Sequence, residues 1–177
     1  MNTHKCLTGI ISITLVFAIL FSLTGCSKFI EDMNSERYGA KRLAKKEAEE
    51  IFKMLKEEDV EGLSALFSED SRIEHSIETE WKLFFEHLDG KVVSYSGISF
   101  PGEGMGVDEN GVIYDSHLSI NYNNVKTDTG TVYKEFGYYQ TRIDTRNPDL
   151  EGINVFVAKH PDTNTYIDVG GFSSEVD

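Results

Sequence analysis

The sequence predicts an α+β domain in which three amino-terminal helices pack on a curved antiparallel sheet of four to five strands. Two observations lead to this fold class. Before residue 90, apolar side chains recur at three- and four-residue steps, which is the spacing of an amphipathic helix. After residue 90, β-branched and aromatic side chains predominate between regular turn signals, and no helical pattern interrupts them. Helices followed by uninterrupted strands are typical of a sheet that helices cover on one face.

Three helices are expected before residue 90. The first spans residues 38–56, and Asp59 is placed to cap a shorter second helix. The third ends at Asp89–Gly90 and carries Trp81, which is expected in the core. The apolar residues behind these predictions are Ala40, Leu43, Ala44, Ala48, Ile51, Phe52 and Leu55 in the first helix, Val60, Leu63, Leu66 and Phe67 in the second, and Ile73, Ile77, Trp81, Phe84, Phe85 and Leu88 in the third.

Turn residues separate the expected strands. The glycine-rich segment Pro101–Gly106 is expected to be a loop between the first two of them. It does not match a phosphate-binding loop, because no helix follows it and it lacks the Gly-Lys-Ser/Thr ending. The strands are predicted at Lys91–Phe100, Val112–Val125, Thr131–Asp144 and Ile153–His160, with a short fifth at Tyr166–Val169.

Length and composition limit the class of protein. The chain has 177 residues, of which 40% are hydrophobic, so one domain with a buried core is expected over residues 38–177. Its 30 acidic side chains outnumber the 17 basic ones, and the net charge is −13. This charge disfavours nucleic acid as a partner, because phosphate binding depends on lysine and arginine.

The amino terminus has the layout of an export signal. Lys5 precedes an apolar run, Leu7–Leu23, which is interrupted by hydroxyl groups and a glycine. The run ends in Leu23-Thr24-Gly25-Cys26, which resembles the bacterial lipobox, the motif in which the cysteine receives diacylglycerol before cleavage ahead of it. The alternative is an uncleaved membrane anchor. The run is 17 residues long, which is short against the roughly 20 apolar residues of a spanning helix.

The lipobox predicts how the mature protein is held. Residues 1–25 are expected to be a lipoprotein signal peptide, and residues 26–37 a lipid-bearing tether attached to the membrane through Cys26. Two or more acyl chains make such an anchor durable. Cleavage also removes Cys6, so the mature chain would keep no free thiol and no cysteine chemistry. The expected location is the extracytoplasmic face of the cell membrane.

Several segments resemble a known family. They are the helices around residues 51–67, the segment 81–97, the stretch 124–127 leading to Gly130 and Tyr133, and the pair Gly152–Ile153. Together they look like bacterial lipoproteins with the domain of unknown function 5104. The resemblance implies a cone-shaped fold similar to those of nuclear transport factor 2 and the cystatins, with a pocket at the open end. The family has no assigned activity, so the resemblance supplies no catalytic residue.

The strand predicted at 112–125 supplies the only candidate catalytic pair. Alternation places Val112, Tyr114, Leu118, Ile120 and Tyr122 on one face, and Asp115, His117, Ser119 and Asn121 on the other. If the polar row lines a pocket, Asp115 and His117 can form an acid–base pair. If it faces solvent, the same pattern is the ordinary alternation of a half-exposed antiparallel strand.

Other motifs in the sequence favour no specific chemistry. Asp128-Thr129-Gly130 matches the aspartic protease signature, but Lys126 and Thr127 precede it instead of an apolar strand, so a surface hairpin is expected. No metal site or cofactor is predicted, because the histidines never occur at a short ligand spacing. The histidines considered are His75, His87, His117 and His160.

The sequence leaves two specific functions open, beside a purely structural role in the cell envelope. The first is a lipid-anchored, noncatalytic module that binds a small ligand or an envelope protein. The second is a small hydrophobic-pocket enzyme that uses Asp115 and His117. The enzyme requires a desolvated acid or base inside an enclosed cavity, whereas the module requires a filled interior and an exposed apolar patch. The adjacent Tyr138 and Tyr139 must point to opposite sides of their strand, so one of them can face a pocket.

Overall fold

The computed structural model describes residues 41–171. The chain divides into two units, residues 1–46 and residues 47–177, and the described part of the first, residues 41–46, is helical. The predicted signal peptide (1–25), the tether (26–37) and Cys26 lie outside the described residues. Among the described residues, no helix is both long and apolar enough to span a bilayer.

The second unit begins with helical residues 47–57 and then has three short helices, α2 (Val60–Ala65), α3 (Glu69–Glu74) and α4 (Ile77–His87). The side chain of Asp59 accepts a hydrogen bond from the backbone N–H of Gly62, which confirms the predicted cap of the second helix. α4 ends at His87, two residues before the predicted Asp89–Gly90 stop, with Leu88 as its C-cap.

The third predicted helix is wrong as a single element, because it is two helices. His75 has an extended backbone (φ −125°, ψ 150°), which ends α3, and Ser76 precedes the first residue of α4. Ile73 is 76% exposed, although the predicted stripe assigned it to the core. Trp81 is fully buried, as predicted. The described chain therefore has four helices instead of the three expected.

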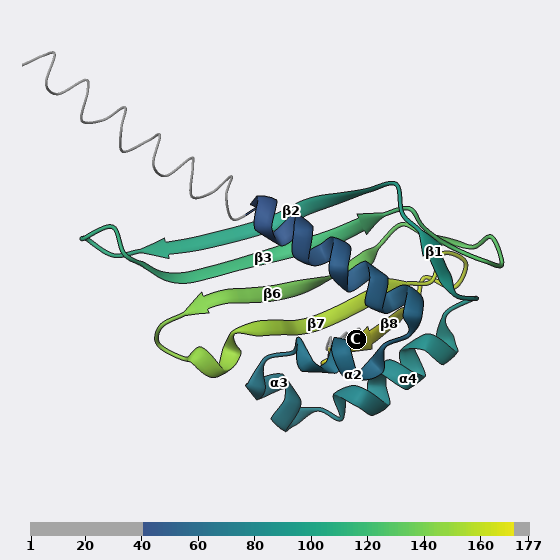
Figure 1. Cartoon of the computed structure of the whole chain (residues 1–177), viewed down its shortest axis with the longest axis horizontal. Helices are drawn as coiled ribbons and strands as arrows, with labels where there is room; N and C mark the ends of the chain where they lie inside the picture. Colours follow the sequence, from purple (N-terminus) through teal and green to yellow (C-terminus); the bar gives the residue numbers. More distant parts are fainter. Residues whose placement is uncertain (1–40, 172–177) are drawn as a thin grey trace, which may run out of the picture. The chain divides into compact units, whose positions relative to one another are not determined.

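In residues 41–171, eight strands form two antiparallel sheets, where four to five strands in one sheet were expected. Figure 1 shows how the longer strands lie side by side. The larger sheet has the order β2-β3-β6-β7-β8, and the smaller has the order β1-β4-β5. The larger sheet consists of β2 (Gly97–Val107), β3 (Ile113–Asn123), β6 (Phe136–Asp144), β7 (Gly152–Lys159) and β8 (Tyr166–Val169). The smaller consists of β1 (Val92–Ser94), β4 (Val125–Thr127) and β5 (Val132–Tyr133).

The first three predicted strands each divide between the two sheets. For example, β3 ends at Asn123, and Asn124 adopts a φ of +51° before β4 begins in the other sheet. The predicted loop Pro101–Gly106 is wrong, because it belongs to β2. Its glycines make room for side chains of β3: a Cβ at Gly104 would lie 2.1 Å from the His117 ring. These glycines therefore serve cross-strand packing and do not form a turn.

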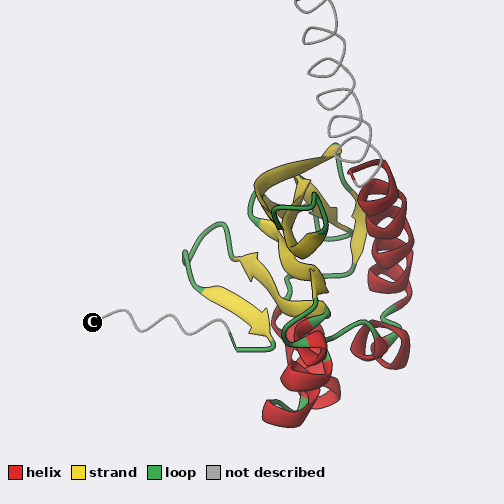
Figure 2. Cartoon of the chain, turned by 90° about the vertical axis from the view of Figure 1, so that its left-hand side faces the viewer, coloured by secondary structure: helices red, strands yellow, loops and turns green. Residues whose placement is uncertain are grey.

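The two faces of the five-stranded sheet differ. We call the face that carries Leu118, Ile120 and Tyr122 the helix-covered face, because the Tyr122 hydroxyl donates to the backbone oxygen of Ala48 in the first helix. Trp81 of α4 packs on the same face, with its ring 5.0 Å from that of Phe156. We call the opposite face the open face. Figure 2 shows the curvature of the strands and the helices beside them.

Candidate functional site

Asp115 and His117 lie on the open face, and the expected alternation along β3 is present from Ser116 onward. Val112, which was expected on the apolar face, precedes the strand and is 59% exposed. His117 Nδ1 is 3.6 Å from Asp115 Oδ2, and the two side chains are 36% and 37% exposed. The His117 ring also lies 5.6 Å from that of Tyr139 on β6. The predicted pair is thus brought together at the surface, without the enclosure that an acid–base site in a pocket requires.

A groove of about 430 Å³ crosses the open face beside this pair. It spans four neighbouring strands, β2, β3, β6 and β7, and neither Asp115 nor His117 lines it. A Cβ at Gly137 would lie 2.0 Å from the backbone oxygen of Ile120, so the groove is bare backbone at this position. The lining residues are Ser99, Pro101, Ser119, Ile120, Asn121, Lys134, Glu135, Phe136, Gly137, Tyr138, Tyr139, Val155 and Val157.

The apolar part of the groove comes from β6 and β7. Val155 and Val157 alternate along β7 with the buried Phe156, so their side chains lie on the open face. Burial, followed by the negative charge of Asp115, raises the pKa of Tyr139. Tyr138 instead stacks on Phe156 with the ring centroids 5.9 Å apart. The expectation that these adjacent tyrosines serve opposite faces is confirmed.

A chain of hydrogen bonds fixes the polar end of the groove. The backbone N–H of Phe136 donates to Asn121 Oδ1 at 3.0 Å. A backbone N–H can only donate a hydrogen bond, so the amide atom that faces it must be the oxygen, and this fixes the orientation of the Asn121 amide. Asn121 Nδ2 then donates to Asn123 Oδ1 at 2.9 Å, and the Ser99 hydroxyl donates to the same oxygen at 2.9 Å. Both amides are therefore held in one orientation before any ligand arrives.

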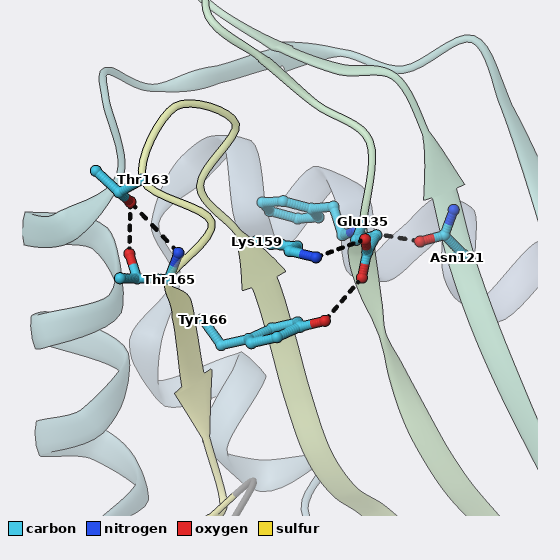
Figure 3. A network of polar contacts seen from close by, with 7 residues as sticks. Asn121, Glu135, Lys159, Thr163, Thr165 and Tyr166 are labelled. Carbon is cyan, nitrogen blue, oxygen red and sulfur yellow. Dashed lines mark hydrogen bonds and ion pairs between the residues drawn. The ribbon is translucent and has the colours of Figure 1, made fainter. Parts of the chain in front are cut away.

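Glu135 anchors a second polar group at this end of the sheet (Figure 3). Lys159 Nζ lies 3.3 Å from Glu135 Oε1, and the Tyr166 hydroxyl donates to Glu135 Oε2 at 3.0 Å. The hydrogen bond with Glu135 raises the pKa of Lys159. The Lys159 ammonium is also 5.2 Å from the centre of the Tyr166 ring. Both oxygens of the carboxylate that lines the groove are thus engaged within the protein.

The remaining sequence candidates occupy structural positions. Asp128 lies in the turn between β4 and β5, where its carboxylate accepts from the backbone N–H of Lys91 at 3.0 Å, so the predicted hairpin is confirmed. His75 Nδ1 lies 3.4 Å from Glu80 Oε1, and neither residue lines the groove. Within residues 41–171, no group of three or more histidine, cysteine or acidic side chains is arranged to hold a metal ion.

Ser119 and Asn121 were expected on the polar row of their strand, but the groove itself was not predicted. The residues that line the groove come together only through strand pairing, which places Asn121 opposite Gly137 and Gly137 opposite Val157. One signal was available in the sequence: Val155 and Val157 flank the buried Phe156 in a strand whose other face would be expected to be polar.

Comparison with known proteins agrees with the resemblance seen in the sequence. A family model described as domain of unknown function (DUF5104) matches residues 50–157. The match covers more than half of the chain and includes β2, β3, β6 and most of β7. The chain therefore belongs to this family. No curated protein matches it.

Proposed function

We propose that this DUF5104 protein is a noncatalytic binding module, held on the extracytoplasmic face of the cell membrane by lipid on Cys26, and that the open-face groove is its binding site. The observation that carries the proposal is the contrast between the faces of one sheet. Large buried side chains such as Trp81 and Tyr122 fill the helix-covered face, whereas the open face keeps a groove with an apolar floor and oriented polar groups.

The same contrast weighs against the enzyme alternative. An acid–base pair gains catalytic strength when it is desolvated beside bound substrate. Asp115 and His117 are each more than one-third exposed and lie outside the groove lining. A binding role needs neither of them.

The support for the lipid anchor comes from the sequence alone. The lipobox ends at Cys26, and the predicted tether, residues 26–37, would keep the module close to the lipid surface. We also assign the domain to the cone-shaped folds of nuclear transport factor 2 and the cystatins. The support for this assignment is a curved antiparallel sheet with helices on one face.

The anchor is tested by Cys26→Ser in the native host. We expect the variant to leave the membrane fraction and to lose incorporation of radioactive palmitate, because serine offers no thiol for acylation. Ser27→Ala serves as the control and should behave like the wild type. If the Cys26→Ser variant stays in the membrane fraction and the wild type incorporates no palmitate, the spanning-anchor alternative is favoured.

The groove is tested with three water-soluble probes that share a phenylbutyl tail: 4-phenylbutyrate, 4-phenylbutanamide and 4-phenylbutylamine. The lipidated mature protein, residues 26–177, is held in nanodiscs and titrated with each probe while backbone amide NMR shifts are followed, with empty nanodiscs as the blank. At least one probe should give saturable shifts at Gly137, Val155 and Val157. Val157→Phe, which fills the groove beside Gly137, should abolish them.

Two further variants keep this test decisive. Val155→Phe fills the groove from a second position, in case Val157→Phe disturbs the fold. Val112→Phe changes a side chain that is 59% exposed and does not line the groove, so it should leave binding intact. The proposal fails if no probe shifts the groove amides, or if binding survives both groove-filling variants.

A further inference from the structure

The groove presents hydrogen-bond donors to a ligand. Asn121 uses one of the two N–H bonds of its amide on Asn123, which leaves the other available. The amide of Asn123 is oriented with its oxygen inward, so both of its N–H bonds remain available beside the groove. Among the described residues, the Ser119 hydroxyl and the Lys134 ammonium have no side-chain hydrogen bond, and both line the groove.

The amide and carboxylate oxygens of the groove, by contrast, already accept hydrogen bonds within the protein. Asn121 Oδ1 accepts from the backbone N–H of Phe136, and Asn123 Oδ1 accepts from two donors. The two oxygens of Glu135 each have one partner, Lys159 and Tyr166. A ligand group that donates hydrogen bonds would therefore share oxygens that already have partners, whereas a group that only accepts them would meet donors that have none.

The local charge favours one negative group. Lys134 and Glu135 are the only charged lining residues, and their charges cancel. Glu135 is paired with Lys159, so the Lys134 ammonium is the lining charge without an ion-pair partner among the described residues. Asp115 and Asp168 lie on the same face outside the lining, and the whole chain carries −13. A single anionic head thus has Lys134 as its partner, while a polyanion would be repelled by the surrounding surface.

From these observations we propose that the groove binds a small monocarboxylate with an apolar tail. The carboxylate lies among Asn121, Ser119 and Lys134, and the tail lies over Val155 and Val157. This inference rests on the proposed function, since it names the ligand class of the same groove. A carboxylate accepts hydrogen bonds through two oxygens and donates none, so it matches what the polar end offers.

The ranking of the three probes tests the ligand class separately from the function. We expect 4-phenylbutyrate to bind about tenfold tighter than 4-phenylbutanamide, because hydrogen bonds to a charged group are the stronger ones, and 4-phenylbutylamine to bind weakest. Lys134→Gln should weaken the acid about threefold and leave the amide unchanged. Lys126→Gln, which removes an exposed charge outside the groove, is the matched control.

The neutral contact is tested by Ser119→Ala, which should weaken the acid about threefold through the loss of one donor. Added salt should weaken the acid and spare the amide, because it screens the exposed Lys134 charge. Binding of the amide or the amine at least as tight as that of the acid overturns the ligand class while the binding function stands. Absence of binding by all three overturns both.

Discussion

The two faces of the five-stranded sheet carry side chains from the same strands but differ in how these side chains are packed and buried. On the helix-covered face, aromatic rings pack edge to face, as between Phe84 and Phe156 at 5.5 Å, and burial is nearly complete. On the open face, the side chains of Ser119, Asn121 and Tyr139 are half-exposed, and Asn121 donates a hydrogen bond to Asn123. The difference assigns the buried core to one face, while the other is the face on which the proposed binding site lies.

Polar groups illustrate the contrast further. On the helix-covered face, the Tyr138 hydroxyl is buried without a hydrogen-bond partner among the described residues, so it is a cost to folding. On the open face, the Asn121 and Asn123 amides are held by partners that fix their orientation. If this division is correct, substitutions on the first face change stability and those on the second change binding.

The largest effect is expected at Trp81. Its indole is fully buried and contacts the rings of Phe67, Phe84, Phe85 and Phe156. Trp81→Ala should lower the free energy of unfolding by about 3–5 kcal/mol, because it leaves a cavity among these rings. Urea denaturation followed by circular dichroism measures the loss. Ile73→Ala, at an exposed position, should cost less than about 0.5 kcal/mol, and a similar loss for both variants would contradict the assignment of the core.

The second-largest effect is expected at alkaline pH, which should lower the free energy of unfolding through tyrosines on the helix-covered face. Burial raises the pKa of Tyr122 and Tyr138 above the usual value of 10.0, whereas both titrate normally once unfolded. Between pH 10 and the raised values, the unfolded state therefore binds fewer protons, and the free energy of unfolding falls as pH rises. The slope should be about 1.4 kcal/mol per pH unit for each such tyrosine. Denaturation measured between pH 9 and 11 tests this slope, which should flatten in the Tyr122→Phe, Tyr138→Phe double variant.

Smaller effects on the free energy of unfolding, of opposite sign, are expected when the hydroxyl of Tyr122 or of Tyr138 is removed alone. The Tyr122 hydroxyl donates to the backbone oxygen of Ala48 at 2.7 Å, so Tyr122→Phe should cost about 1 kcal/mol. Tyr138→Phe removes an unpaired buried hydroxyl and should be neutral or stabilising. Thermal unfolding at pH 7 distinguishes the two. Equal losses would mean that the hydroxyls have equivalent surroundings, contrary to the packing described.

The sequence predicts the helix-covered face better than the open one, for a physical reason. The core stripe around Trp81 is encoded by local spacing, which is visible in a single helix. The break at His75–Ser76 is not visible, because Ile73 and Ile77 keep the helical spacing across it. The glycines of Pro101–Gly106 were assigned to a loop because glycine and proline are typical of turns, and the space that the glycines leave for β3 side chains becomes visible only once the two strands are paired.

The groove belongs to the part that local spacing cannot encode. Asn121, Gly137 and Val157 share one row across three strands, and only the pairing register brings them together. The direction of the Asn121 amide depends on a backbone N–H at Phe136, which no side-chain pattern indicates. Residue types on the polar row were therefore predictable, while the site that they form was not.

The smallest effect is expected at His117, and it tests whether the open face works by binding alone. His117→Ala removes a partly exposed ring that contacts Tyr139 and faces Asp115 at 3.6 Å, so the free energy of unfolding should change by less than about 0.5 kcal/mol. Because His117 lies outside the groove lining, binding of 4-phenylbutyrate should stay within about twofold of the wild type. NMR titration of the lipidated protein measures both the affinity and the amides affected. A tenfold loss of affinity, with shifts centred on Asp115 instead of Gly137, would move the functional site to the pair that the sequence first suggested.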